Sequence, residues 1–322
     1  MKHAKYLILF ACAVVIAFSS SCSKKTAVAA RTIRIGIQPS AAFVPLYVVR
    51  YTGALEAALA QKNVTVVWQD FQSGPPMNES LAADLTDIGV IGDVPTVLAL
   101  AGSTRMKLVG IPARGPDAYA LISRAADRNL TVRKDIKGKR IATVFGSTGH
   151  NFTKKLLEED GLSLENIEFL NIAVGNAEEV LESNTADAVV IWEPNVTRMV
   201  DKGLAKIVAQ GSETNLRGTN GFVVREEFLA SSSDIVKAVL EAYATAASQL
   251  DSLDDATVVK LSNGLQITKD QLQKILRKYD FTVAITKEDI ASLQDTIRFL
   301  VSINNLPTEY PVEGCIDSSC LP

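Results

Sequence analysis

The residues best placed to bind a small molecule lie in four short segments, each at the point where an apolar run gives way to a turn or a helical pattern. They are Ser73-Gly74-Pro75, Gly92-Asp93, Gly146-Ser147-Thr148 and Trp192-Glu193-Pro194. The first residues of a helix carry free N–H groups and a partial positive charge, which together attract anions. Serine and threonine hydroxyls beside them add neutral donors. These segments therefore predict the binding of a small organic anion.

Two of the segments share one arrangement, in which a strand is followed by a glycine turn and a helix start. Ser73 offers a hydroxyl and Pro75 suits the first turn of a helix. Ser147 or Thr148 begins the second helix. The alternative is structural, because tight turns are common and serine and threonine are ordinary N-caps. We expect the functional arrangement, with the two helix starts facing each other across a cleft.

The acidic and aromatic residues of the other two segments allow more than one role. Asp93 can cap a helix or line the cleft, where it would repel a bare anion but pair with an ammonium group. The same alternatives apply to Glu193. Trp192 can form an apolar wall for an alkyl chain or belong to the core, and we expect the ligand contact. Further polar candidates are Gln38, Thr219 and Asn220.

The elements that must position these residues alternate between short β-branched runs and helical stretches. Strands are predicted over 32–38, 64–69, 87–91, 106–112, 119–123, 140–144, 167–171, 186–191, 204–209 and 221–224. Helices are predicted over 46–60 with a break at Gly53, and over 94–101, 148–160, 177–183, 235–250, 269–278 and 287–303. This alternation predicts an α/β fold of two lobes, each a mainly parallel sheet flanked by helices. The chain would cross between the lobes near 113–117 and 211–217, and a ligand would bind beyond the carboxyl ends of the strands.

Four motifs, in order, resemble the aliphatic sulfonate, nitrate and taurine binding-protein family. They are WQDFQSGPPMNESL (68–81), IGDVPT (91–96) with ALAG (99–102), GKRIA (138–142) with GSTGHN (146–151), and DAVVIWEP (187–194). The resemblance runs from residue 32 to residue 243 and implies a type II periplasmic-binding-protein fold whose lobes close on the ligand. It also implies delivery to an ABC permease with a cytoplasmic ATPase, and a cleft-facing donor at His150. The chain departs from the family at Glu193, where aspartate is more usual.

The N-terminal segment is typical of an exported lipoprotein. Lys2 and Lys5 precede an apolar run over 6–18 that is too short to span a bilayer. Ser19-Ser20-Ser21-Cys22 resembles the lipobox of bacterial lipoproteins, in which the cysteine is acylated, although an aliphatic residue is preferred where Ser19 stands. The alternative is an ordinary secretory peptide cut near Ala30, which would leave a soluble protein.

These observations divide the chain into five parts. We expect a signal peptide over 1–21, a lipidated tether over 22–31, the first part of lobe 1 over 32–113, lobe 2 over 114–214, and the return to lobe 1 with C-terminal helices over 215–322. The protein would be a monomer in the periplasm or at the cell surface, held to the membrane through Cys22.

Composition argues against several partners and cofactors. The formal net charge is −3, and losing the lysines of the signal segment makes the chain more acidic, so a nucleic-acid partner is not expected. The two histidines are His3 and His150, and we expect neither a metal site nor a cofactor. Cys315 and Cys320 could form a small disulfide in an oxidising compartment or remain free thiols. We expect the disulfide.

Other functions on the same fold remain open. We do not expect an enzyme, because no cysteine lies between Cys22 and Cys315 to act as the nucleophile of the related sulfinate desulfinases. A ligand-sensing domain is a further alternative. Among ligands we expect an aliphatic sulfonate, with taurine, nitrate and thiamine precursors as alternatives.

Overall fold

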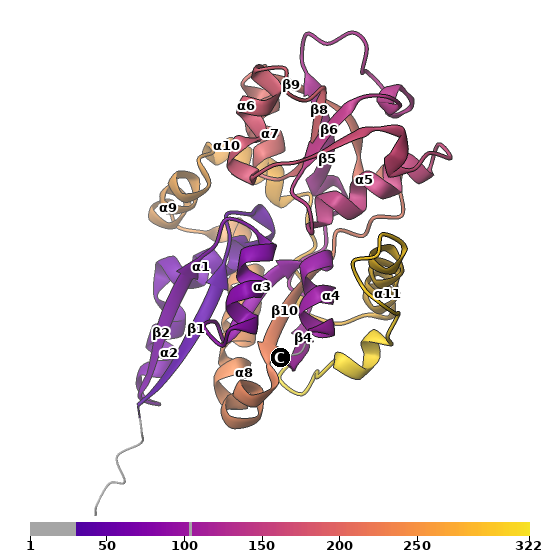
Figure 1. Cartoon of the computed structure of the whole chain (residues 1–322). Coiled ribbons are helices and arrows are strands. Elements are labelled where there is room, and N and C mark those ends of the chain that lie inside the picture. Colours follow the sequence, from indigo (N-terminus) through magenta and orange to yellow (C-terminus); the bar gives the residue numbers. More distant parts are fainter. Residues whose placement is uncertain (1–29, 103–104) are drawn as a thin grey trace, which may run out of the picture.

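The computed structural model describes residues 30–102 and 105–322, which form two lobes (Figure 1). The predicted signal peptide, Cys22 and nearly all of the predicted tether lie outside the described residues. Among the described helices, none combines the length and apolar character that crossing a bilayer requires.

Lobe 1, the lower lobe in Figure 1, is built on a five-stranded sheet in the order β2-β1-β3-β10-β4. Its strands are β1 (Arg31–Ile37), β2 (Val64–Asp70), β3 (Ile88–Gly92), β4 (Met106–Gly110) and β10 (Asn220–Arg225). The helices between the first four strands are α1 (Val44–Thr52), α2 (Ala54–Ala60), α3 (Gly74–Ala82) and α4 (Asp93–Ala101). The central strand β3 has the sequence IGVIG and is buried throughout, as expected where both faces of a sheet are covered.

Lobe 2, the upper lobe, repeats this pattern in the order β7-β6-β8-β5-β9. Its strands are β5 (Tyr119–Arg124), β6 (Arg140–Thr143), β7 (Glu168–Asn171), β8 (Ala188–Trp192) and β9 (Ala205–Gln210). Its helices are α5 (Thr148–Glu158), α6 (Ala177–Glu182) and α7 (Asn195–Asp201). Its core is separate from those of lobe 1.

Each sheet is mainly parallel, as the sequence predicted, with one strand that runs against the other four. Strand β10 is antiparallel to β3 and β4, and β5 is antiparallel to β8 and β9. Each of these two strands comes directly from a crossing between the lobes. It therefore enters its sheet at the edge where the parallel strands end and must run in the opposite direction. The two-lobed α/β fold with mainly parallel sheets is confirmed, and each sheet includes one reversed strand.

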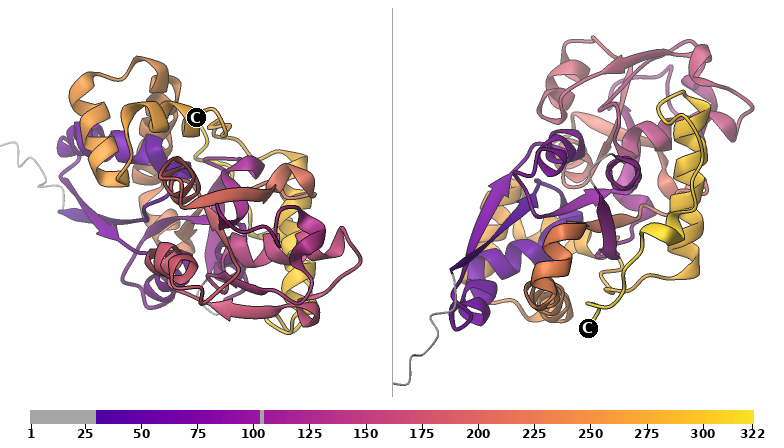
Figure 2. Two further views of the ribbon diagram at one scale, coloured as in Figure 1. Left: turned by 90° about the horizontal axis from the view of Figure 1, so that it is seen from above. Right: turned by 60° about the horizontal axis from the view of Figure 1, so that its bottom comes forward.

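The C-terminal part of the chain adds helices to lobe 1. They are α8 (Glu226–Ser248), α9 (Asp255–Leu265), α10 (Lys269–Leu276) and α11 (Lys287–Ser302). Helix α8 packs against α1 and α2 on one face of the sheet, and α11 packs against α4 on the other. The views in Figure 2 show α11, in yellow, running beside both lobes.

The two segments that cross between the lobes lie side by side. Residues 111–118 lead from β4 to β5, and residues 211–219 lead from β9 to β10. The Gly115 N–H donates to the Gly218 carbonyl oxygen over 3.3 Å. Gly218 has a φ of 64°, and a Cβ there would lie 2.4 Å from the Gly115 oxygen. Because a side chain would collide at this point, glycine is required for the two crossings to pair so closely.

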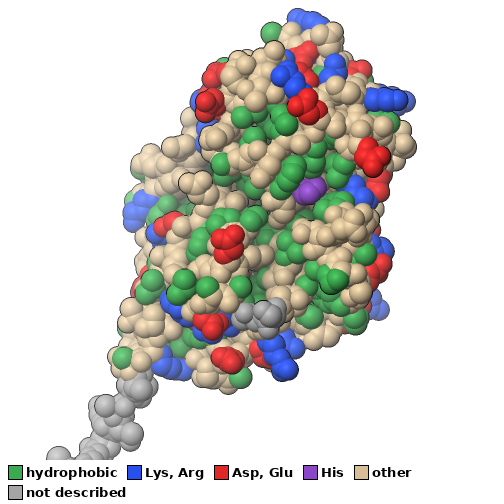
Figure 3. All heavy atoms as spheres, in the orientation of Figure 1, with side chains coloured by type: hydrophobic (Ala, Val, Ile, Leu, Met, Phe, Trp, Pro, Cys, Tyr) green, Lys and Arg blue, Asp and Glu red, His purple; other side chains and the backbone are tan. Residues whose placement is uncertain are grey.

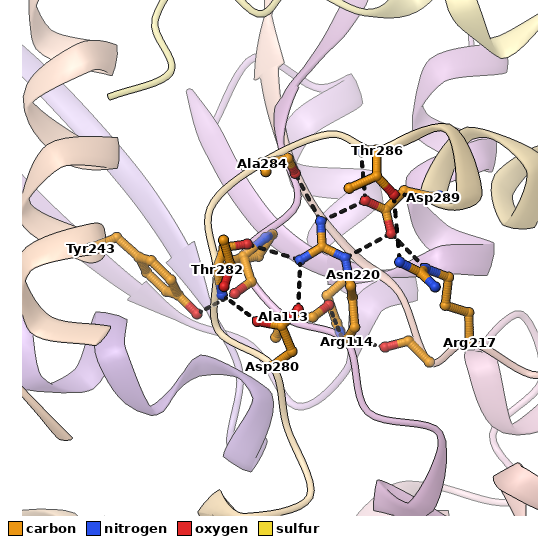
Figure 4. A network of polar contacts seen from close by, with 12 residues as sticks. Ala113, Arg114, Arg217, Asn220, Tyr243, Asp280, Thr282, Ala284, Thr286 and Asp289 are labelled. Carbon is orange, nitrogen blue, oxygen red and sulfur yellow. Dashed lines mark hydrogen bonds and ion pairs between the residues drawn. The ribbon is translucent and has the colours of Figure 1, made fainter. Parts of the chain in front are cut away.

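Asp289, in the first turn of α11, joins both crossings (Figure 4). Its Oδ1 accepts from Arg114 Nε and from Arg217 Nε, each over 2.7 Å, and its Oδ2 accepts from Arg114 Nη2 over 2.5 Å. Burial raises the pKa of this carboxyl, but hydrogen bonds from Arg114, the Thr286 N–H and Arg217 outweigh burial and lower the pKa to about 2. The carboxylate is therefore ionised at neutral pH and holds one arginine from each crossing.

Candidate ligand-binding site

A small cavity of about 20 Å³ lies between the lobes, at the carboxyl ends of the parallel strands. Its lining residues are uncharged and come from both lobes: Gln38, Ser40, Phe43, Gly74, Gly92, Pro95, Tyr119, Ser147, Thr148, Trp192 and Asn220. On the outer face seen in Figure 3, acidic and basic side chains are interspersed. The cavity thus differs from the surface around it in having no charged side chain among its described lining residues.

Three helices begin at the cavity. Helix α3 starts at Gly74, α4 starts directly after Gly92, and α5 starts at Thr148 with Ser147 as its N-cap. The N–H groups of a first helical turn lack partners within the helix, and the helix dipole adds partial positive charge there. Helix starts from both lobes therefore face one space, as the sequence predicted for Ser73-Gly74-Pro75 and Gly146-Ser147-Thr148.

The lobes touch at the rim of this cavity. A Cβ placed on Gly92 of lobe 1 would lie 2.3 Å from Thr148 Oγ1 of lobe 2. A Cβ on Gly146 of lobe 2 would lie 3.6 Å from Pro75 Cγ of lobe 1. The structure therefore shows the lobes closed against each other, and Gly92 is needed for that approach.

The polar lining offers neutral groups. The Tyr119 hydroxyl lies buried beside Thr148 and Asn220, and burial raises its pKa, so the phenol stays protonated. Gln38 is 6% exposed and its Oε1 has no hydrogen-bond partner. Buried amide oxygens are normally satisfied, so Gln38 Oε1 is left as an acceptor for a donor group of a ligand or for a water.

Ser40 is a lining residue that the sequence analysis missed. It follows β1 and caps a 3₁₀ helix (Ala41–Phe43) that leads into α1, with its Oγ accepting from the Ala42 N–H over 3.3 Å. Ser147 occupies the same topological place in lobe 2, after β6 and before α5. The signal was present, because Ser40 also lies between a predicted strand and a helical stretch.

Tyr119, Phe43 and Pro95 were also missed as lining residues. Tyr119 begins a buried strand, and Phe43 is 1% exposed. In sequence, a strand residue or an apolar residue of this kind looks like core. Only the arrangement of the elements brings these side chains to the cavity.

The two carboxylates predicted to line the cleft, Asp93 and Glu193, are hydrogen-bonded to other groups of the protein and do not line the cavity. Asp93 Oδ1 accepts from the Val94 N–H over 2.7 Å, and its Oδ2 accepts from Asn151 Nδ2 over 2.8 Å. Glu193 is fully buried and accepts from the Thr197 N–H over 3.0 Å and from Lys278 Nζ over 2.5 Å. Neither is placed to pair with the ammonium group of a ligand.

His150 lies beside the cavity but does not line it. Its ring stacks on Phe145 with the centroids 5.0 Å apart and meets the edge of Phe299 at 5.3 Å. Its Nδ1 accepts from the Gly146 N–H over 3.4 Å. Burial lowers the pKa of His150 to about 4. The structure thus packs a neutral ring among aromatic side chains where the resemblance implied a donor to the ligand.

Three other predicted residues, Ser73, Pro75 and Thr219, also fall outside the lining. Ser73 precedes α3 without capping it through its side chain, and Pro75 lies in the first turn of that helix. Thr219 is fully buried beside the return to lobe 1, and its Oγ1 has no hydrogen-bond partner. Of the sequence candidates, the cavity brings together Gln38, Gly74, Gly92, Ser147, Thr148, Trp192 and Asn220.

The expected disulfide between Cys315 and Cys320 is not formed, and both thiols are free. Cys320 is 3% exposed and donates to the Ser233 carbonyl oxygen over 3.5 Å, whereas Cys315 packs with the core around α11. The two thiols are thus held by different neighbours. Among the residues that the structure describes, no group of His, Cys, Asp and Glu side chains forms a metal site.

Comparison with known proteins first defines the class. The fold matches the alkanesulfonate-binding protein SsuA from Xanthomonas axonopodis pv. citri bound to MOPS, with a TM-score of 0.80 and 24% identity over 89% of this chain and 98% of that one. It also matches the periplasmic aliphatic sulphonate binding protein SsuA from Escherichia coli, with a TM-score of 0.78 and 20% identity over 89% and 97% of the two chains. The fold is that of a periplasmic binding protein.

The family follows from the sequence match. The profile of the NMT1/THI5-like family matches residues 76–250, which is more than half of the chain. The chain therefore belongs to the NMT1/THI5-like family. A relative from Bacillus subtilis (strain 168), named putative aliphatic sulfonates-binding protein, is 29% identical over 90% of this chain and 86% of its own length.

Proposed function

We propose that this protein is the extracytoplasmic solute-binding component of an ABC importer and that it captures an aliphatic sulfonate. The observation that carries the proposal is the convergence of three helix starts with neutral hydroxyl and amide groups between the two lobes. The cavity left there, of about 20 Å³, has room for about one water and must widen around a sulfonate. A sulfonate has three oxygens that accept hydrogen bonds and one permanent negative charge. Neutral donors and helix dipoles can stabilise such a charge without a counter-ion.

The occupied carboxylates narrow the ligand class. A zwitterion such as taurine carries an ammonium group, and burying that charge without a counter-ion is unfavourable. Asp93 and Glu193 are satisfied within the protein, so we favour an alkanesulfonate without a cationic end. Trp192 and Phe43 supply apolar surface for an alkyl chain.

The test compares two ligands of nearly the same shape by isothermal titration calorimetry and thermal shift. Propane-1-sulfonate carries a methyl group where taurine carries an ammonium group. We expect propane-1-sulfonate at 100 times its Kd to stabilise the folded state by about 2.7 kcal/mol, and taurine to bind at least about tenfold more weakly because its ammonium group is left unpaired.

Nitrate and a thiamine-type pyrimidine complete the panel. Clear stabilisation by either of them, with none by propane-1-sulfonate, would overturn the sulfonate assignment. Taurine binding as tightly as propane-1-sulfonate would overturn the argument from the occupied carboxylates while leaving the fold class unchanged.

The same proposal includes export and attachment to a membrane through acylated Cys22, supported by the charged start, the short apolar run and the small residues before that cysteine. A secretory peptide cut near Ala30 is the alternative. Mass spectrometry of the mature N-terminus separates the two, since only the first leaves a diacylglyceryl group on Cys22. The closed lobes would be recognised by a permease with a cytoplasmic ATPase, and we propose that the protein acts as a monomer.

A binding role is favoured over an enzymatic one on this fold. Cys315 and Cys320 are the cysteines that the structure describes, and neither lines the cavity. A cysteine-dependent desulfinase would need its nucleophile there. Turnover of a sulfonate or sulfinate by the purified protein would contradict the binding role.

A further inference from the structure

Helix α11 belongs to lobe 1 but reaches lobe 2. Its apolar side chains Leu293, Ile297 and Leu300 share a core with Val94 and Val97 of α4. Its N-terminal end is fixed at the crossings between the lobes, as described above for Asp289. An adjacent face of α11, with Asp295, Thr296 and Phe299, contacts α5, the helix of lobe 2 that begins at the cavity. Helix α11 therefore moves with lobe 1, and its contacts with α5 join the two lobes.

The contacts between α11 and α5 form a continuous seam. Phe299 meets the ring of His150, and Asp295 forms an ion pair with Lys155. Lys155 is 8% exposed and also donates to Asn215 Oδ1 over 2.7 Å. Burial raises the pKa of Asp295, but the hydrogen bond and charge of Lys155 outweigh burial and lower it. The Asp295 carboxylate is thus ionised opposite the lysine.

A buried polar triad lies at the middle of the seam. Asp93, Asn151 and Thr296 are each at most 1% exposed. Asn151 Nδ2 donates to Asp93 Oδ2 over 2.8 Å, and Thr296 Oγ1 donates to the same oxygen over 3.1 Å. Asp93 and Thr296 belong to lobe 1, whereas Asn151 belongs to lobe 2. None of the three lines the cavity.

We propose that Asn151 is a positioning residue whose bond to Asp93 forms when the lobes close and sets the population of the closed state. A ligand that binds only the closed state has an apparent affinity proportional to the fraction of molecules that are closed. Asn151 therefore controls ligand affinity without touching the ligand. This last statement rests on the proposed function, whereas the effect on closure does not.

The triad also explains how the lobes can reopen. Asn151 Oδ1 is buried in the closed structure and has no hydrogen-bond partner. When the lobes separate, this oxygen can bind water, which favours opening. The amide thus donates across the seam to Asp93 and, over 3.3 Å, to Thr296 Oγ1, while it leaves one acceptor unsatisfied. These two effects oppose each other. A fully satisfied contact would hold the lobes closed more firmly.

The decisive variant is Asn151→Asp, which places a second carboxylate against Asp93 in a buried site. Repulsion should open the lobes, and small-angle X-ray scattering without ligand should show a larger radius of gyration than in the parent. The double variant Asp93→Asn with Asn151→Asp exchanges the two partners and should restore the smaller radius. Asn176→Asp is the matched control, because it makes the same charge change at an exposed position of lobe 2.

Circular dichroism and cooperative thermal unfolding check that each variant is folded. The second variant is Asn151→Ala. It removes the donor without adding a charge and should enlarge the radius in the same direction by less. An unchanged radius in both Asn151→Asp and Asn151→Ala overturns the proposal. So does a double variant that stays as open as the single one.

Affinity is measured separately with propane-1-sulfonate. We expect Asn151→Asp to raise its Kd about tenfold, within the usual range of coupling between a conformational change and binding, and Asn176→Asp to leave it unchanged. If the parent does not bind propane-1-sulfonate, the proposed ligand fails, yet the scattering comparison still decides whether Asn151 controls closure.

Discussion

The two lobes share one plan and differ in what covers it. In each sheet the four strands that run in one direction follow the same order. Each sheet also places an arginine of its second-position strand on an aspartate before its central strand: Arg34 on Asp87 in lobe 1, and Arg140 on Asp187 in lobe 2. Lobe 1 alone carries the C-terminal helices. The ligand cavity therefore comes from the shared plan. The added helix α11 provides its own side of the seam and the hinge anchor, which is Asp289 with Arg114 and Arg217 of the two crossings.

The shared plan also explains the cavity lining. Ser40 and Ser147 occupy equivalent places after the first parallel strand of each lobe, and both cap the helix that follows. Lobe 2 adds Tyr119 and Trp192, and lobe 1 adds the starts of α3 and α4. A ligand between the lobes is thus surrounded by helix starts and neutral donors from two similar halves.

The largest effect is expected at the hinge anchor that only the C-terminal helices provide. Asp289→Ala leaves Arg114, which is 6% exposed, and Arg217 without their shared carboxylate. Removing one partner of a buried ion pair typically lowers the free energy of unfolding by about 3–5 kcal/mol, which urea denaturation would measure. Glu178→Ala, which removes an exposed ion pair with Lys202 within lobe 2, should change it by at most about 1 kcal/mol. Equal effects of the two substitutions would contradict the anchoring role.

A second prediction compares the equivalent aspartates. Asp87 is 2% exposed and accepts from both Arg34 and Arg225. The side chain of Asp187 is 22% exposed and, among the arginines that the structure describes, is paired with Arg140 alone. Asp87→Ala should therefore lower the free energy of unfolding by about 3 kcal/mol and Asp187→Ala by about 1 kcal/mol. The reverse order in urea denaturation would contradict the argument that burial and a second arginine partner set the size of the loss.

The third prediction concerns pH and the aromatic contact between α11 and lobe 2. Burial lowers the pKa of His150 to about 4, against about 6.5 in an unfolded chain. Between these values the unfolded state binds the proton and the folded state does not, so stability falls as pH drops from 6.5 towards 4. Between pH 7 and pH 4.5 the histidine should contribute a loss of about 2–3 kcal/mol.

His150→Gln is the comparison for this prediction, because glutamine does not titrate. Its free energy of unfolding should depend less steeply on pH than that of the parent, whatever its absolute stability at pH 7. Identical pH slopes from urea denaturation at pH 7 and pH 4.5 would show that the His150 ring is protonated as easily in the folded state as in water.

Much of the local structure could be predicted from the sequence. The break of the first helix at Gly53 is found, where the glycine adopts a φ of 69° between α1 and α2. The strands, α10 and α11 also fall close to their predicted positions, because short β-branched runs and 3.6-residue periodicity are local signals. Helix α8 begins at Glu226 rather than at residue 235, and α9 (Asp255–Leu265) was not predicted. The helix starts at Gly74, Gly92 and Ser147 were identified in the same way, from turn and capping residues.

The chemical roles of side chains were harder to predict. Asp93 and Glu193 were expected as possible ligand partners, and whether they were free depended on Asn151, Thr296 and Lys278, which lie far away in the sequence. His150 depended likewise on Phe169 and Phe299. A carboxylate or an imidazole looks the same in sequence whether it is paired or free.

By itself the sequence determined the two series of strands and helices, the helix starts that can receive an anion, and an N-terminal segment typical of export. The tertiary structure decided which of these groups share one cavity, that β5 and β10 run against their neighbours, and that α11 joins hinge and lobes. The reason is the separation along the sequence over which each effect acts. Backbone preference and capping act over a few residues, whereas pairing, burial and the closure of two lobes depend on contacts between residues more than fifty positions apart, such as Asn151 and Asp93.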